Sequence, residues 1–331
     1  MSTFKEIRGT LIKSVSSDPA NPVLGEMWYN STTGSQALKG VVSITGQWSS
    51  GGNLNTARDG LAGCGTQSAG LAFAGELAPG PTKSTDTEEY NGSSWSEQNN
   101  LSTARKVPGG LGTQTAALCF GGFNDPGVTV VPATEEYGGT SWTSGGNLGT
   151  GRYNITGRGT QTAGLAFGGS PPGAAGLVNT EEYGGTSWTA GGNLPVAKRS
   201  GGSAGTQTAG LSFGGLVNPN TNINTTEEYD GSSWTSGGNM NNARRTLVGD
   251  GPQTAALAFG GFDSSNSSKT EKYDGTSWTV APDMATARRY LAGAGTQTAG
   301  LGFGGYSPSG KTTATEEFTD GTITQTFTTS T

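Results

Sequence analysis

Paired acidic residues are the feature of this sequence that comes closest to catalytic chemistry. The tripeptide TEE occurs five times in 331 residues. Two carboxylates that flank a glycosidic bond can act as general acid and as nucleophile or base. Adjacent residues of a β-strand point to opposite faces, so the two acids of one TEE cannot bracket the same bond. Acids from different copies could, which keeps a glycan-cleaving enzyme as the weaker hypothesis, but an acid repeated this regularly is typical of architecture.

Other catalytic groups are scarce. The sequence contains no histidine, which excludes nearly every familiar hydrolase triad, zinc site and copper oxidase site. Cys64 and Cys119 fall at different places within their repeated segments, so we expect small core residues rather than a disulfide or a redox pair. The glycine-rich runs follow strands and lead into loops, unlike a phosphate-binding loop. We expect no enzyme activity, no metal and no cofactor.

Basic residues gather at two adjacent repeat positions, which hold ten of the 19 Lys and Arg residues. The first ring is Arg58, Arg105, Arg152, Lys198, Arg244 and Arg288, and the second is Lys106, Arg199, Arg245 and Arg289. The facing acids are Glu88, Glu135, Glu181, Glu227, Glu271 and Glu316. We expect structural ion pairs between the first ring and these acids. A cationic mouth that grips carboxylated or phosphorylated sugars is the alternative, and for Arg199, Arg245 and Arg289 both interpretations stay open.

These positions belong to a repeated unit. The segment GTQTAGLAFGG at residue 159 has near copies at 65, 112, 205, 251 and 295, at spacings of 44 to 47 residues. Six copies at one period indicate a repeat architecture. The unit 142–187 shows no helical spacing of apolar residues and predicts four short strands, at about 153–158, 162–168, 180–183 and around Trp188.

Side-chain size is graded along each unit. Glycine and alanine dominate the first two strands, and bulky aromatic residues occupy the last two. The aromatic residues are Tyr90, Tyr137, Tyr183, Tyr229, Tyr273 and Phe318, followed by Trp95, Trp142, Trp188, Trp234 and Trp278. Sheets that radiate from an axis crowd together near it and separate farther out, which explains the grading. The sequence therefore predicts an all-β, six-bladed β-propeller with four-stranded antiparallel blades over 41–331, closed by 41–48 or alternatively by 322–327.

The repeated residues resemble the kelch repeat. That pattern has a basic residue at the start of the first strand, an apolar strand that ends in Gly-Gly, then Glu-x-Tyr-Asp and a Trp. The matching elements are the first basic ring, the Gly doublets at 121, 168, 214, 260 and 304, and TEEY followed by Trp. Lys198, Phe318 and the GTQT turn depart from it. The resemblance covers about residues 41 to 327 and implies a β-propeller with four strands in each blade.

The two faces of such a ring differ in sequence. The turns on one face, GTQT and DGSS or GGTS, recur almost unchanged, whereas the loops between the second and third strands on the other face differ in every blade. Loops on a rigid scaffold often carry recognition. We therefore predict a contact surface on the variable face, around Phe123, Leu216, Phe262 and Tyr306 with Arg199, Arg245 and Arg289. Alternatively, the loops vary without function and these side chains fold down to cap the blades.

The overall charge excludes one class of partner. A net charge of −6 and a pI of about 4.8 disfavour broad nucleic-acid binding, which depends on basic surfaces. No segment is long and apolar enough to span a bilayer, and the basic start lacks the apolar run of a signal peptide. We expect no nucleic-acid partner, no membrane insertion and no signal peptide.

The first forty residues predict a separate attachment segment. GEMWYNSTTGSQALKG is typical of a hairpin with strands 27–30 and 37–41, and it resembles the N-terminal portions of bacteriophage tail-fibre and other virion proteins. The resemblance implies a non-enzymatic virion structural protein. Its partners would be other virion proteins through residues 1–40 and a host surface glycan or protein through the propeller loops. The alternative function is a cellular kelch scaffold that binds a protein partner. The alternative for the N-terminal segment is a plain hairpin that buttresses the last blade and attaches to nothing. A homo-oligomer stays open.

Overall fold

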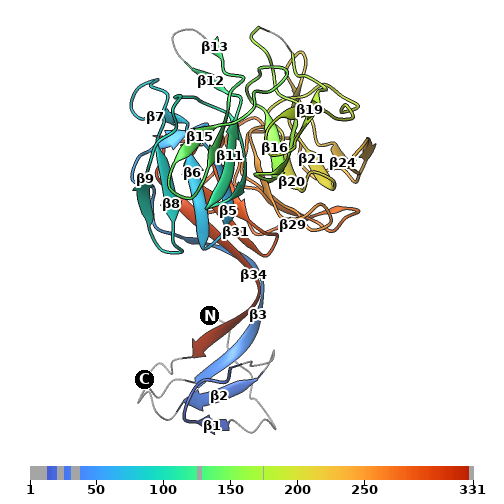
Figure 1. Ribbon diagram of the computed structural model, residues 1–331. Helices are drawn as coiled ribbons and strands as arrows, with labels where there is room; N and C mark the ends of the chain where they lie inside the picture. Colours follow the sequence, from blue (N-terminus) through green and yellow to red (C-terminus); the bar gives the residue numbers. More distant parts are fainter. Residues whose placement is uncertain (1–12, 21–25, 31–37, 125–128, 174, 328–331) are drawn as a thin grey trace. The chain divides into compact units, whose positions relative to one another are not determined.

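The computed structural model describes residues 13–20, 26–30, 38–124, 129–173 and 175–327. In these residues every regular element is a β-strand, and no helix could cross a bilayer (Figure 1). The chain divides into two compact units, one of residues 47–319 and one of residues 1–46 with 320–331. The expected division lay at residue 40.

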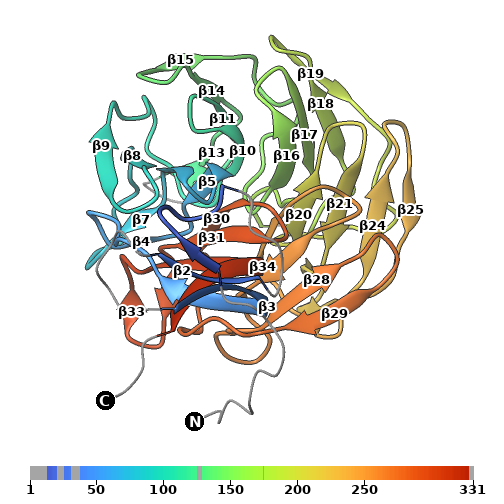
Figure 2. The ribbon, with the colours of Figure 1, turned by 90° about the horizontal axis from the view of Figure 1, so that it is seen from below.

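The larger unit is a six-bladed β-propeller, and Figure 2 shows the ring of blades face-on. Each blade is a four-stranded antiparallel sheet, and the inner strands contact each other in a closed cycle that returns from β30 to β5. The strands of each blade are given from the inner to the outer one. Blade 1 is β5 (Ala62–Thr66), β6 (Ala69–Phe73), β8 (Thr87–Tyr90) and β9 (Trp95–Gln98), and blade 2 is β10 (Gly109–Thr113), β11 (Ala116–Phe120), β14 (Thr134–Tyr137) and β15 (Trp142–Ser144). Blade 3 is β16 (Thr156–Thr160), β17 (Ala163–Phe167), β18 (Thr180–Tyr183) and β19 (Trp188–Ala190), and blade 4 is β20 (Gly202–Gly205), β21 (Gly210–Phe213), β24 (Thr226–Tyr229) and β25 (Trp234–Ser236). Blade 5 is β26 (Val248–Asp250), β27 (Leu257–Phe259), β28 (Thr270–Tyr273) and β29 (Trp278–Ala281), and blade 6 is β30 (Ala292–Gly295), β31 (Ala299–Phe303), β34 (Thr315–Phe327) and β3 (Leu38–Ser50).

Blade 6 closes the ring with strands from both ends of the chain. β3 pairs with β34 as the outer strand, and residues 322–327 continue β34 instead of forming a strand of their own. Trp48 of β3 packs against Phe318 at 5.3 Å and against Phe259 of blade 5 at 5.0 Å between ring centroids. Its indole N–H donates to Thr270 Oγ1 at 3.0 Å. The prediction that the segment around Trp48 closes the ring is confirmed.

The size grading follows from close contact between neighbouring blades. A Cβ on Gly63 of the inner strand β5 would lie 2.4 Å from the Phe303 ring, and one on Gly249 would lie 2.2 Å from the Phe213 ring. The outer gaps hold stacked aromatic rings, such as Trp142 against Phe73 of the preceding blade at 5.0 Å. Small inner and bulky outer residues are therefore both required by the wedge shape of the space between blades.

The repeated GTQ turn also has a structural role. The side-chain amide of Gln161 donates to the backbone carbonyls of Ala117 and Tyr137 in the preceding blade, at 3.2 and 2.7 Å. The same pair of bonds occurs in every blade, from Gln67, Gln114, Gln207, Gln253 and Gln297. This clamp explains why the turn is nearly constant.

The inner strands begin later than expected. The first strand of the unit 142–187 was predicted at 153–158, but β16 starts at Thr156. Asn154 has a φ of +50°, a left-handed conformation that no strand contains. Arg152 and its counterparts therefore precede the inner strands instead of starting them.

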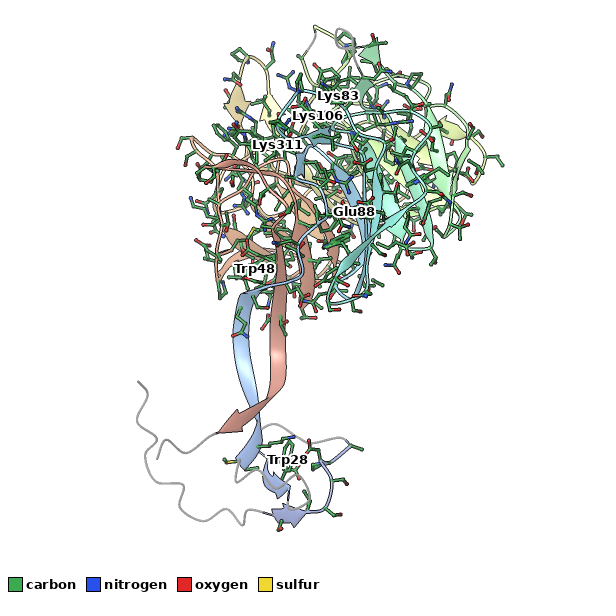
Figure 3. The ribbon with its side chains drawn as sticks, turned by 90° about the vertical axis from the view of Figure 1, so that its left-hand side faces the viewer. Trp28, Trp48, Lys83, Glu88, Lys106 and Lys311 are labelled. Carbon is green, nitrogen blue, oxygen red and sulfur yellow. The ribbon has the colours of Figure 1, made fainter. Side chains whose placement is uncertain are left out.

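In the smaller unit, β2 (Met27–Asn30) pairs antiparallel with the first residues of β3 and parallel with β1 (Lys13–Val15). The Trp28 ring is buried, and its N–H donates to Asp18 Oδ1 at 3.1 Å (Figure 3). The strand predicted at 27–30 is present, and its partner begins at Leu38. The STTG turn and Ala37 lie outside the described residues.

Candidate functional site

The loops of the variable face carry short hairpins of their own. They are β12 (Phe123–Asn124) with β13 (Thr129–Val130), β22 (Leu216–Val217) with β23 (Thr221–Asn222), and β32 (Tyr306–Ser307) with β33 (Gly310–Lys311). In blade 1, β4 (Arg58–Asp59) pairs with β7 (Glu76–Leu77) across the two inner strands that lie between them in the chain. These hairpins stand on the blades at the end where the loops differ in sequence. They give the variable face a backbone that hydrogen bonds hold in place.

The first basic ring and its acids form buried ion pairs within each blade. Arg58 lies 2.9 Å from Glu88, and Arg288 lies 2.8 Å from Glu316. The other pairs are Arg105–Glu135, Arg152–Glu181, Lys198–Glu227 and Arg244–Glu271. Burial lowers the pKa of Arg58, and Glu88 opposes that shift. Because both partners are fully enclosed, these groups brace the blades and do not present charge to a ligand.

The second basic ring contributes to a stack on the variable face. The guanidinium of Arg245 lies 4.7 Å from the centre of the Phe262 ring, and that of Arg289 lies 5.0 Å from the same ring and 4.9 Å from the Tyr306 ring. All four side chains are partly exposed. We call these four residues the guanidinium–aromatic stack. A cation above an aromatic face is attracted by the ring electrons, so these contacts hold the two guanidinium groups against the two rings.

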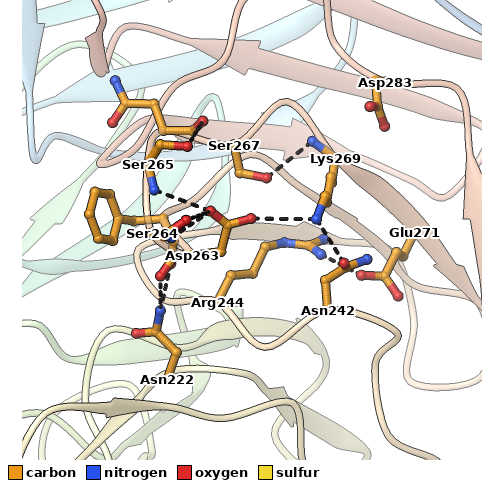
Figure 4. Close-up of polar contacts among 12 residues, drawn as sticks. Asn222, Asn242, Arg244, Asp263, Ser264, Ser265, Ser267, Lys269, Glu271 and Asp283 are labelled. Atoms are coloured by element: carbon orange, nitrogen blue, oxygen red, sulfur yellow. Dashed lines mark hydrogen bonds and ion pairs between the residues drawn. The ribbon is translucent and has the colours of Figure 1, made fainter.

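The loop that carries Phe262 is braced on both sides (Figure 4). Asn222 donates to the carbonyls of Phe262 and Asp263, at 3.1 and 2.7 Å. Lys269 donates to Asn242 Oδ1 at 2.8 Å and to Asp263 Oδ2 at 3.4 Å. Burial would raise the pKa of Asp263, but N–H groups of Ser264 and Ser265 and the Lys269 ammonium lower it. Phe262 is therefore presented from a fixed loop.

The remaining predicted contact residues do not join this stack. Phe123 packs edge-on against Tyr153 at 5.3 Å, with Lys83 at 5.3 Å from its ring centre. Leu216 is only 6% exposed, and its backbone exchanges hydrogen bonds with Arg199 at 2.9 and 3.1 Å. Leu216 therefore caps its blade, as the alternative interpretation expected, and offers no exposed apolar contact.

A lysine cluster on the same face was not anticipated (Figure 3). Glu76 contacts Lys311 at 2.8 Å, Lys83 at 3.0 Å and Lys106 at 3.3 Å, and Asp59 contacts Lys106 at 3.1 Å. Burial alone would raise the pKa of Glu76, but the hydrogen bonds from Lys311 and Lys83 lower it to about 2. The signal in the sequence was the acid at position 76, where the other blades carry Phe, Ser, Leu or Tyr after the Gly doublet.

An axial cavity also opens on the variable face. It measures about 130 Å³ and is lined by the segments that precede and begin the six inner strands. Arg158 borders it, and Asp250 lies 3.0 Å from Arg158. The sequence offered a clue, because the same repeat position holds Cys64, Leu111, Ala204 and Ala294 in the other blades.

Few reactive groups are available for catalysis in the described part of the chain. It contains no group of three or more His, Cys, Asp or Glu side chains placed to hold a metal ion. Cys64 and Cys119 are buried free thiols, and burial raises the pKa of each to about 12. Comparison with protein-family models and with curated proteins found no match.

Proposed function

We propose that this chain is a non-enzymatic virion appendage protein of a phage. In this proposal the kelch-like propeller binds a glycan or protein of the host surface through its variable face, and the N-terminal segment attaches it to other virion proteins. The observation that carries the proposal is the guanidinium–aromatic stack, which stands on loops that differ between blades while the opposite face stays constant.

The chemistry of the stack suits an acidic sugar. Aromatic faces bind the apolar face of a sugar ring, and a guanidinium binds carboxylates through charge-assisted hydrogen bonds. Arg245 already donates to Asn222 Oδ1 at 2.9 Å, so its orientation is fixed before a ligand arrives. Weak contacts of this kind give strong attachment when many copies act together on one particle.

The repeated acids support a role other than catalysis. The first Glu of each TEE is held in a buried ion pair, as Glu88 is by Arg58. The second Glu accepts a hydrogen bond from a tyrosine of the next blade, as Glu182 does from Tyr229 at 2.6 Å. Both carboxylates therefore have partners within the blades, which supports a structural role for them.

The binding part of the proposal is tested with a panel of bacterial surface polysaccharides. Arg245→Ala combined with Arg289→Ala should weaken binding of acidic polysaccharides at least about tenfold, because two charge-assisted contacts are lost. Arg199→Ala is the matched control, since it removes the same charge at the same repeat position next to Leu216 instead of an aromatic ring. Binding of an acidic protein but of no polysaccharide would favour the cellular scaffold. Hydrolysis of a polysaccharide would contradict the non-enzymatic role.

The attachment part is tested separately. A variant that lacks residues 1–40 should form a folded propeller with unchanged polysaccharide binding, yet it should not be incorporated into particles. Normal incorporation of this variant would contradict an attachment role for the segment.

A further inference from the structure

A collar of backbone hydrogen bonds surrounds the mouth of the axial cavity. One residue from each blade donates its N–H to the carbonyl of the preceding member, at 2.7 to 3.2 Å, and the cycle closes on itself. The members are Gly60, Val107, Asn154, Ser200, Thr246 and Tyr290. All six have φ between +47° and +61°, although only glycine adopts this conformation easily. The collar therefore fixes five different side chains and one glycine around one opening.

The cavity walls are narrow and mostly apolar, because the inner strands supply glycine and alanine there. Within the described residues, the side chains of Asn154 and Ser200 at the mouth make no hydrogen bond, and neither does Nη1 of Arg158. Arg158 borders this cavity and also a second one of about 300 Å³ at the constant face. It therefore lies between the two and forms the floor of the upper cavity.

The Arg158 side chain is held by two partners from other blades. Its Nε donates to the Ser203 carbonyl at 3.0 Å, and its Nη2 donates to Asp250 Oδ1 at 3.0 Å. Arg158 keeps 15% of its side-chain surface exposed, whereas Asp250 keeps 1%. These bonds leave the Nη1 edge of the guanidinium as the part without a protein partner.

This pair is not explained by the needs of the fold. The other four blades hold Cys64, Leu111, Ala204 or Ala294 at the same position, in hydrophobic clusters, and a buried ion pair is weak evidence of stabilisation. Asp250 Oδ2 is fully enclosed and has no hydrogen-bond partner in the described part of the chain. An enclosed carboxylate oxygen without a partner calls for an explanation, and a bound water or ligand is one.

We propose that the axial cavity is a binding site for a small monocarboxylate, which is held by Nη1 of Arg158 and by the polar side chains of the mouth. A cavity of about 130 Å³ has room for several waters or for an organic acid of similar bulk. Because the Asp250 carboxylate offsets part of the Arg158 charge, the site suits a singly charged ligand better than the more highly charged phosphate. None of the four residues of the guanidinium–aromatic stack lines this cavity, and the site does not depend on the proposed virion role.

Binding should be linked to a proton. Burial raises the pKa of Asp250 to about 7, and Arg158 opposes the shift. The other titratable group that faces the pair is the Cys64 thiol, whose pKa is raised to about 12 by burial, so it stays neutral. When Asp250 gains a proton, the Arg158 charge loses its internal partner and attracts a carboxylate more strongly.

The experiment is an NMR titration of the full chain, labelled with ¹⁵N, with sodium acetate as the probe and acetamide as the neutral probe of the same shape. We expect saturable shifts at the Arg158 Nε–H and at the Asn154 and Ser200 amides with acetate only. Affinity should be at least about threefold higher one pH unit below pH 7 than one unit above it. Absence of saturable shifts with acetate, or equal shifts with acetamide, would overturn the proposal.

Two variants locate the site. Arg158→Ala combined with Asp250→Ala installs the residue that blades 4 and 6 already carry at this position, and it should weaken acetate binding at least about tenfold. Arg158→Lys retains the charge without the planar fork and should bind several-fold more weakly, which keeps the test open if the double variant does not fold. Lys39→Ala, which removes a basic side chain of the smaller unit, should bind acetate like the wild type. Unchanged binding in both axial variants would refute the assignment.

Discussion

Five of the six contacts between neighbouring blades contain a hydrogen bond from a tyrosine hydroxyl to a glutamate of the preceding blade. The pairs are Tyr90–Glu317, Tyr137–Glu89, Tyr183–Glu136, Tyr229–Glu182 and Tyr273–Glu228. In four of these contacts the hydroxyl lies against a glycine that ends the preceding outer strand. A Cβ on Gly237, for example, would lie 2.7 Å from the Tyr273 hydroxyl. At the contact of blades 1 and 2 this position holds Gln98, and the Tyr137–Glu89 bond is longer, at 3.0 Å.

The sixth contact, between blades 5 and 6, is built differently. Phe318 stands in place of the tyrosine, Lys272 in place of the glutamate, and Ala281 and Pro282 in place of the two glycines. In three other contacts the second glycine donates its N–H to the tyrosine hydroxyl at 3.3 to 3.4 Å, and proline has no N–H. The hydroxyl, its acceptor, its donor and the space it needs are therefore absent together.

The joint replacements at the contact of blades 5 and 6 lead to a quantitative prediction about stability. Phe318 is fully buried, so Phe318→Tyr places a hydroxyl without an acceptor against the Ala281 Cβ and should destabilise the protein by about 2 kcal/mol. Adding Lys272→Glu and Ala281→Gly restores an acceptor and the space. A hydrogen bond to a charged group contributes about 1.5–3 kcal/mol, so the triple variant should return to within about 1 kcal/mol of the wild type.

Urea denaturation measures both changes, provided that the slope of the transition stays constant between variants. The control is Tyr229→Phe, which leaves Glu182 without its tyrosine donor and should cost about 1.5–3 kcal/mol. The reasoning is refuted if Phe318→Tyr alone leaves the transition midpoint unchanged. It is equally refuted if the triple variant is no more stable than the single one.

Two further predictions concern the channel. Val107→Gly should stabilise the protein by about 0.5–1 kcal/mol in thermal denaturation, because a β-branched residue is strained at φ +47° and glycine is not. Val107→Ala retains the Cβ and should gain less, and an equal gain would show that strain is not the cause. Asp250 binds its proton more tightly in the folded chain, where its pKa is about 7, than in the unfolded chain, where it is 3.8. The protonated carboxyl therefore contributes its full stabilisation below about pH 4. This stabilisation, up to about 4 kcal/mol, is lost as the pH rises through 7. Asp250→Asn should flatten that part of the stability curve, and an unchanged curve would contradict the raised pKa.

The ring could be predicted from the sequence because its geometry acts on every repeat in the same way. Crowding near the axis selects glycine at positions such as Gly63, and the wide outer gap selects rings such as Trp142. The order of strands and the closure at Trp48 follow from that regularity. The start of β16 did not, because the left-handed conformation of Asn154 is imposed by hydrogen bonds to neighbouring blades, which no local pattern records.

The candidate sites were harder to predict, since they depend on which departures from the repeat meet in space. Arg245, Phe262, Arg289 and Tyr306 were expected on one face, but their stacking depends on loop positions that only the folded ring fixes. Leu216 was expected there too, and its blade buries it. Arg158 and Asp250 are 92 residues apart and come together only because the ring closes.

Departures from the repeat are therefore of two kinds, and the difference bears on function. The changes at Lys272, Ala281, Pro282 and Phe318 cancel one another, so together they conserve the blade contact. Arg158 and Asp250 instead place an ion pair where the other blades have small or apolar residues, with an Asp250 oxygen that is enclosed and has no hydrogen-bond partner in the described part of the chain. A fold maintained by six near-identical units has no need of such an uncompensated pair. This is why we place a ligand at the axis and only packing at the contact of blades 5 and 6.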